Sequence, residues 1–167
     1  WGIPKHGLEI VCDSASINIE SLGVQWVMPS SGNTIPPELS LLSSLEYLDL
    51  SMNSLIGTIP SQLSALTSLE ALYLGRNELT GTIPPGLSEL TSLSALDISW
   101  NELVGTVPSH LSSHAGLRKL YLGHNHFTGT IPHQLSVLTD LSTLDLESNR
   151  LTGAIPSQLE ALRVLKE

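Results

Sequence analysis

Histidine is the residue type in this 167-residue sequence with the clearest potential for chemistry, because five of its six copies are clustered. A neutral imidazole binds transition metals, and its pKa near neutrality suits proton transfer. None of the clustered histidines has a cysteine or carboxylate at metal-site spacing, so solvated histidines at turns are favoured and no metal is expected. The clustered residues are His110, His114, His124, His126 and His133.

Three regularly spaced aspartates raise a second possibility, general acid–base catalysis. Asp49, Asp97 and Asp145 recur in every second repeat of a 24-residue pattern, which corresponds to roughly 9.6 Å on parallel strands. Glycosidase carboxylates can lie that far apart, but nothing in the sequence supplies a cleft around them. Phosphate-binding loops, the G-x-S-x-G turn and the H-E-x-x-H motif are missing from the sequence. We therefore expect neither enzymatic activity nor a cofactor.

Exposed aromatic and arginine side chains offer a third kind of chemistry, noncovalent recognition. Aromatic residues make up only 4% of the chain, yet all three tyrosines and Trp100 fall in the same part of the repeat. Such side chains anchor many interfaces, although Tyr and Trp also simply favour exposed strand positions. The predicted ligand-binding residues are Tyr47, Asp49, Tyr73, Arg76, Asp97, Trp100, Arg118, Tyr121, His124 and Asp145.

The elements that must position these residues are five consecutive 24-residue blocks, 42–161, that fit L-x-x-L-x-x-L-x-L-x-x-N-x-L-x-G-x-I-P-x-x-L-x-x. The L-x-L step predicts a short strand with alternating inward and outward side chains. Inward leucines must be covered by neighbouring coils. The pattern therefore predicts an α/β solenoid, a right-handed coil with a concave parallel sheet and an irregular or short-helical convex side. The turn asparagines, which we expect to satisfy backbone groups, are Asn53, Asn77, Asn101, Asn125 and Asn149.

This pattern resembles the plant-type extracellular leucine-rich-repeat class, which includes ectodomains of receptor-like kinases, receptor-like proteins and polygalacturonase-inhibiting proteins. The L-x-G-x-I-P signature carries the resemblance, which covers residues 42–161 closely and 22–41 loosely. It implies a secreted or cell-surface protein that binds a protein or peptide, or a glycan as second choice, on its concave face.

The composition leaves two possibilities for the single cysteine, Cys12. It is either a buried thiol or one half of a disulfide bridge to a residue outside this segment. The resemblance implies the second, because Trp1 and Cys12 resemble part of the C-x-W-x-G-V-x-C cap motif, whose first cysteine would precede Trp1. Residues 1–41 are expected to form an N-terminal cap and a degenerate first repeat with its strand at 24–26. Residues 162–167 are expected to begin a truncated sixth repeat, so we interpret the chain as a segment of a longer protein.

The formal net charge of −9 argues against binding nucleic acid or an anionic membrane, because both require clustered Lys and Arg. Membrane association is expected only through parts of a longer parent chain. Two alternatives to ligand recognition stay open: the segment is a structural spacer, or a column of threonines binds ice. That column is Thr34, Thr58, Thr82, Thr106 and Thr130.

Overall fold

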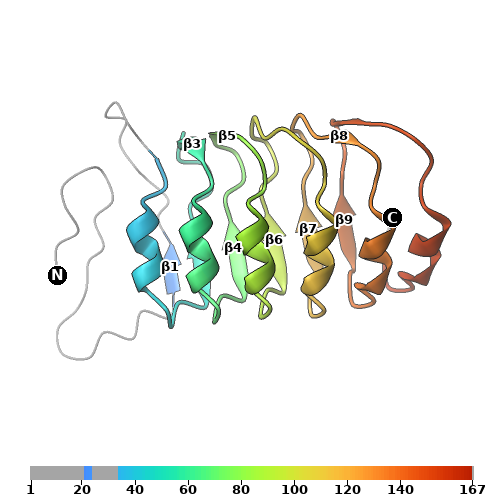
Figure 1. Cartoon of the computed structure of the whole chain (residues 1–167). Coiled ribbons are helices and arrows are strands. Elements are labelled where there is room, and N and C mark those ends of the chain that lie inside the picture. Colours follow the sequence, from blue (N-terminus) through green and yellow to red (C-terminus); the bar gives the residue numbers. More distant parts are fainter. Residues whose placement is uncertain (1–20, 24–33, 167) are drawn as a thin grey trace.

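A computed structural model describes the backbone of residues 21–23 and the whole of residues 34–166. This part of the chain is a stack of coils, each with a short strand on one side and a short 3₁₀ helix on the other (Figure 1). The strands form one parallel sheet in the order β1-β2-β4-β6-β7-β9. The predicted α/β solenoid, with short helices opposite a parallel sheet, is confirmed.

The elements are short and recur once per coil. The strands of the main sheet are β1 (Ser21–Gly23), β2 (Tyr47–Asp49), β4 (Ala71–Tyr73), β6 (Ala95–Asp97), β7 (Lys119–Tyr121) and β9 (Thr143–Asp145). Two further strand pairs lie along one edge: β3 (Ile56–Thr58) with β5 (Glu78–Thr80), and β8 (Thr128–Gly129) with β10 (Arg150–Leu151). The helices are η1 (Pro37–Leu41), η2 (Ser61–Ala65), η3 (Pro85–Glu89), η4 (Ser109–Ser113), η5 (His133–Val137) and η6 (Ser157–Ala161).

Leucines from every coil fill the space between the sheet and the helices. Leu48, Leu72, Leu96 and Leu120 are the middle residues of their strands and are fully buried. Strand pairing puts each of them next to its equivalent in the neighbouring coil. Burying a leucine stabilises the fold by about 1.5–3 kcal/mol. A single coil cannot bury its own leucine, so stability comes from stacking.

An Ile-Pro step, or Val107-Pro108 in the case of η4, starts each helix. Pro84, for example, has φ −67° and ψ 136°, an extended conformation from which η3 begins. The Leu87 N–H then donates to the Pro84 carbonyl at 3.0 Å, and the Leu90 N–H donates to the Leu87 carbonyl at 3.1 Å. These three-residue steps are the pattern of a 3₁₀ helix. They place the fully buried Leu87 side chain against the core.

The invariant glycine of each block is required for two reasons, as Gly81 shows. Its φ of +79° lies in a region that residues with a side chain rarely adopt. A Cβ at this position would also lie 2.9 Å from Cγ2 of Thr58 in the preceding coil. The threonine column therefore packs its methyl groups onto the glycine column.

The strand of the first coil is not where the sequence predicted it. The sequence predicts it at 24–26, whereas β1 spans Ser21–Gly23. It pairs with β2, and Leu22 lies opposite Leu48. The I-x-x-L-x-V sequence around Leu22 matches the strand pattern. Counting back from the Ile35-Pro36 step misplaces the strand, because the sequence has extra residues between Leu22 and this step compared with the regular blocks. Cys12, its expected disulfide and the rest of the predicted cap lie outside the described residues.

Candidate ligand-binding face

Side chains that alternate with the buried leucines project from the outer side of the six-stranded sheet, and we call this surface the sheet face. Neighbouring strand residues point to opposite sides, so Asp97 is half-exposed while Leu96 beside it is buried. All ten predicted ligand-binding residues lie in strands of this sheet or within three residues of their ends, and none is fully buried. The structure therefore brings these residues onto one surface.

Three of the ten residues form a continuous stack just beyond the strand ends. The guanidinium carbon of Arg76 lies 5.1 Å from the centroid of the Trp100 ring. The Trp100 and His124 rings stack with centroids 3.6 Å apart and planes inclined by 18°. An exposed cation–π contact contributes about 0.5–1 kcal/mol. We call these three residues the edge stack, and because Trp100 is 46% exposed, part of its side chain stays open to a partner.

The edge stack is aligned by a turn that recurs in every coil. Arg76, Trp100 and His124 have left-handed φ values of 57°, 54° and 55°, a conformation that costs non-glycine residues roughly 1–2 kcal/mol. The equivalent residues Met52 and Ser148 have φ values of 60° and 52°. The conformation therefore belongs to the repeat, and it sets one outward side chain per coil in a row.

Buried asparagine amides hold these turns in place. Oδ1 of Asn101 accepts a hydrogen bond from the Leu79 N–H at 2.9 Å. Its Nδ2 donates to the carbonyls of Leu74 at 3.0 Å and Ile98 at 3.1 Å. Each such amide joins its own coil to the preceding one. Equivalent bonds are made by Asn77, Asn125 and Asn149.

A second row of side chains runs through the middle of the sheet face, and we call it the central column. Strand pairing places its members opposite one another in the order Asp49, Tyr73, Asp97, Tyr121 and Asp145. Neighbouring strands lie about 4.8 Å apart, so successive carboxylates are separated by roughly 9.6 Å. The column thus alternates between an anion and a phenol at a fixed spacing.

The carboxylates of the central column share one orientation. Oδ1 of Asp97 accepts hydrogen bonds from the Ser99 N–H at 2.9 Å and the Ser99 hydroxyl at 2.6 Å. Asp49 accepts the same two bonds from Ser51 at 2.9 and 2.6 Å. Asp145 accepts one from the backbone N–H two residues later, at 2.9 Å. One carboxylate oxygen is thus fixed in each case, which orients the other.

Glycines make room for two of these carboxylates. A Cβ added to Gly75 would lie 2.9 Å from Oδ1 of Asp97, and a Cβ added to Gly123 would lie 2.6 Å from Oδ1 of Asp145. Contacts this close would force the aspartate side chain to shift, so each of these glycines lets the carboxylate of the next coil keep its position. The two glycines follow β4 and β7, the strands that contribute Tyr73 and Tyr121 to the central column.

Tyr47 extends the aromatic surface at one end of the sheet face. Its ring centroid lies 5.4 Å from that of Tyr73, with the planes tilted by 48°. Burial raises the pKa of the Tyr47 phenol, and the charges of Asp49 and Tyr73 raise it further. The phenol therefore stays protonated and can act as a hydrogen-bond donor.

Two histidines near η4 are more buried than the sequence predicted. His114 occupies the position of a leucine in the other blocks and is fully buried, with Nδ1 2.9 Å from the Leu90 carbonyl oxygen. Nε2 of His114 and Nε2 of His110 are buried without a hydrogen-bond partner in the described structure. Burial lowers the pKa of both; for His114 the Leu90 hydrogen bond opposes this and the His110 charge adds to it. Both are therefore neutral at neutral pH.

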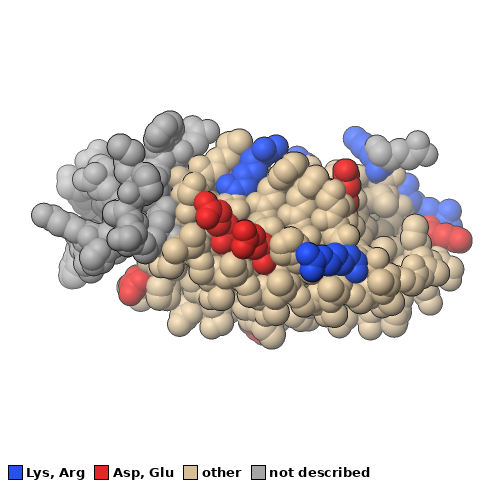
Figure 2. Space-filling model, turned by 90° about the horizontal axis from the view of Figure 1, so that it is seen from above, with Lys and Arg blue, Asp and Glu red and all other residues tan. Residues whose placement is uncertain are grey.

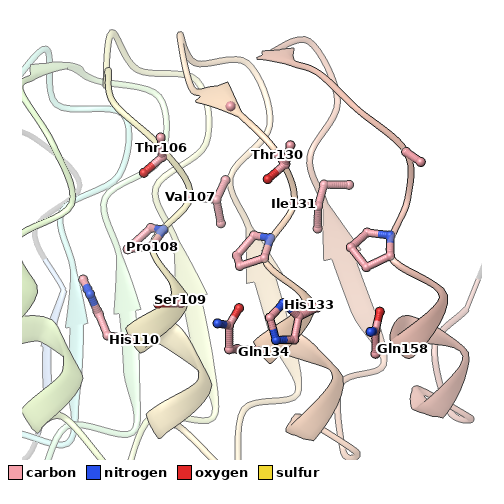
Figure 3. A pocket seen from close by; sticks show the side chains of 14 residues that line it. Thr106, Val107, Pro108, Ser109, His110, Thr130, Ile131, His133, Gln134 and Gln158 are labelled. Atoms are coloured by element: carbon pink, nitrogen blue, oxygen red, sulfur yellow. The ribbon is translucent and has the colours of Figure 1, made fainter.

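The helix side carries open hollows where the Ile-Pro steps of successive coils meet. Figure 3 shows one of them, lined by Thr106, Thr130 and Ile131 together with His110 and His133. Among the described residues, no group of three or more His, Cys, Asp or Glu is placed to hold a metal ion.

Where its residues are described, the edge of the solenoid that Figure 2 shows has no dense cluster of Lys and Arg. Figure 2 looks onto the edge that carries β3, β5 and β8, and outside the grey residues its charged side chains are scattered among uncharged ones. Nucleic-acid binding requires clustered cations. No helix in the described part of the chain is long and apolar enough to cross a membrane.

Comparison with known proteins assigns the family. The family model described as leucine rich repeat matches residues 43–103 and 91–151. The chain belongs to the leucine-rich-repeat family. A comparison with curated proteins finds no significant match.

Solved structures similar to this leucine-rich-repeat chain come from plant receptors. The ectodomain of the Arabidopsis thaliana receptor kinase GASSHO1/SCHENGEN3, in complex with CASPARIAN STRIP INTEGRITY FACTOR 2, is 36% identical with a TM-score of 0.78; the match covers 79% of this chain and 16% of that one. The plant peptide hormone receptor RGFR1, in complex with RGF2, is 39% identical with a TM-score of 0.78, covering 79% and 21%. The Arabidopsis thaliana BIR3–SERK2 complex is 42% identical with a TM-score of 0.65, covering 67% and 60%.

These matches confirm the plant-type character of the repeats. The chain spans only 16% to 22% of the length of the first three receptors that it matches. The shared fold and repeat type therefore apply to this chain, whereas the receptors' ligands belong to those proteins.

Proposed function

We propose that this chain is a non-catalytic recognition module that binds a peptide or protein through the sheet face. The edge stack is the observation that carries the proposal, because it brings an arginine, an exposed tryptophan and a histidine together on the sheet face. Residues that dominate binding energies are enriched in Trp, Tyr and Arg. The tyrosines of the central column extend the same surface.

The rigidity of the sheet face supports this proposal. Asn101 and its equivalents tie each turn to the preceding coil, and Ser99 fixes the Asp97 carboxylate. A surface that is ordered before binding loses less conformational entropy when a ligand arrives. Such a face can bind without first rearranging.

The similar solved structures support the same class of function. The RGFR1 structure is that of a peptide hormone receptor with RGF2, and another match is the Arabidopsis receptor kinase HAESA with the peptide hormone IDA and the co-receptor SERK1. By extension from these ectodomains, we propose that the chain acts outside the cell or at the cell surface. Its ligand is then a secreted or displayed peptide or protein.

A quantitative pull-down from secreted and cell-surface fractions tests the proposal. The wild type is compared with the triple variant Tyr73→Ala/Trp100→Ala/Tyr121→Ala. A matched control, Leu41→Ala/Val137→Ala, removes exposed apolar side chains from helices on the opposite side of the sheet. Circular dichroism first establishes that all three proteins fold alike.

The proposal expects a partner that the wild type and the control retain and the triple variant loses. Retention of the same partners by all three proteins would show that the sheet face is not the binding site. Capture of nothing by any of them would favour the spacer interpretation.

A further inference from the structure

We propose that the central column binds a peptide in the polyproline II conformation that carries a Lys or Arg at every third residue. This inference rests on the proposed function and adds the chemical class of the ligand. Its basis is the match between two repeat distances: the spacing of the carboxylates in the central column and the rise per turn of the peptide backbone.

The first repeat is fixed by the sheet. Asp49, Asp97 and Asp145 lie on one line across five paired strands, with one tyrosine strand between each pair of aspartates. Because parallel strands lie about 4.8 Å apart, the carboxylates recur roughly every 9.6 Å along the solenoid axis.

The second repeat belongs to the ligand. A polyproline II helix has three residues per turn and rises about 3.1 Å per residue, which is roughly 9.3 Å per turn. Residues at every third position therefore point to the same side with nearly the spacing of the carboxylates. A β-strand ligand fits less well, because its residues at every third position point to opposite sides.

The chemistry of the column matches the two kinds of residue that such a peptide presents. Asp97 is flanked on both neighbouring strands by tyrosines, Tyr73 and Tyr121, that are half-exposed. A cationic side chain over Asp97 meets a carboxylate and two aromatic rings, a combination that favours Lys and Arg. The tyrosines also provide the aromatic surface on which prolines of polyproline II ligands pack.

Charge complementarity favours a basic ligand along this line. The central column contains three carboxylates and no cation. Arg76 lies in the edge stack, Arg118 directly precedes β7, and Lys119 is the first residue of β7. The positive groups of the sheet face thus flank the column without interrupting it.

Binding of synthetic peptides to the full chain tests the inference by fluorescence anisotropy. The probe contains four Lys-Pro-Pro repeats, and its control has the same composition with the lysines at irregular intervals. Two variants are compared with the wild type. Asp97→Asn keeps the size and the Oδ1 acceptor but removes the charge, and Glu78→Gln removes an equal charge from the exposed Glu78 of β5, outside the column.

We expect the regular peptide to bind about tenfold more tightly than the irregular one, since the register brings three cations into contact at once. Asp97→Asn should weaken its binding about fivefold, and Glu78→Gln should leave it unchanged. Equal affinity for the two peptides, or equal effects of the two substitutions, would overturn the inference.

The outcome is distinguishable from that of the pull-down. If neither peptide binds, yet a partner is lost in the Tyr73/Trp100/Tyr121 variant, the sheet face is a binding site for a different ligand class. In that case this inference is wrong and the proposed function stands. If the pull-down also fails, both are wrong.

Discussion

Replacing Asn101 by alanine should destabilise the solenoid more than its small size suggests. The Leu79 N–H relies on Asn101 Oδ1, so the substitution leaves this buried donor without a partner. The Leu74 and Ile98 carbonyls lose one bond each. The Leu74 carbonyl keeps a bond from Asn77 at 2.9 Å, and the Ile98 carbonyl keeps one from Asn125 at 3.0 Å. An orphaned buried donor costs about 1–3 kcal/mol and each shared bond about 0.5–1.5 kcal/mol. We therefore expect a loss of about 2–6 kcal/mol in the free energy of unfolding.

Urea denaturation followed by circular dichroism measures this loss, and Asn149→Ala is the matched control. Asn149 makes the same kind of bonds, with its Oδ1 accepting from the Phe127 N–H at 3.0 Å, but it is only half-buried. Water can replace some of the hydrogen bonds that Asn149 makes, so its substitution should lower the free energy of unfolding clearly less. The reasoning fails if Asn101→Ala unfolds at the wild-type urea concentration, or if the two variants are equally destabilised.

Three further outcomes follow from other columns of the repeat. The free energy of unfolding should fall as pH drops below the ordinary histidine pKa of 6.5, because the folded-state pKa of buried His114 is lowered and the unfolded chain takes up protons first. Urea titrations at pH 7.5 and 5 should show that His114→Leu removes much of this fall and that replacing exposed His126 does not. Gly75→Ala should lower the free energy of unfolding by about 1–3 kcal/mol through overpacking, and changing the opposing aspartate to alanine should restore most of it. For the ice-binding alternative, we expect no ice-crystal shaping by the wild type under a cold-stage microscope; shaping that Thr82→Leu/Thr106→Leu abolishes would favour that alternative over ours.

The regular coils could be predicted from the sequence because their constraints are local and repeated. An inward leucine such as Leu96 and an invariant turn residue such as Asn101 recur in every block, so each block supports the assignment of the others. The first coil has no such support, since extra residues separate Leu22 from the Ile35-Pro36 step. Counting back from that step therefore gave the wrong strand position.

The arrangement within the candidate site was less accessible to sequence reasoning. The sequence placed Arg76, Trp100 and His124 in equivalent positions, but their stacking depends on a left-handed turn that aligns one side chain per coil. The burial of His114 was also missed. Its imidazole finds a carbonyl acceptor in the preceding coil, a contact between residues that lie one repeat apart.

The alternation of the central column shows how a packing constraint sets the spacing of a binding surface. The Asp97 carboxylate lies over position 75 of the preceding coil, where glycine leaves room for it. Position 99 is a serine whose N–H and hydroxyl orient Asp97, so a carboxylate at position 121 would meet the Ser99 side chain. An aspartate in every coil would thus crowd the residue that orients its neighbour. A period of two coils avoids this crowding, and that period gives the spacing of roughly 9.6 Å on which recognition of a threefold peptide repeat depends.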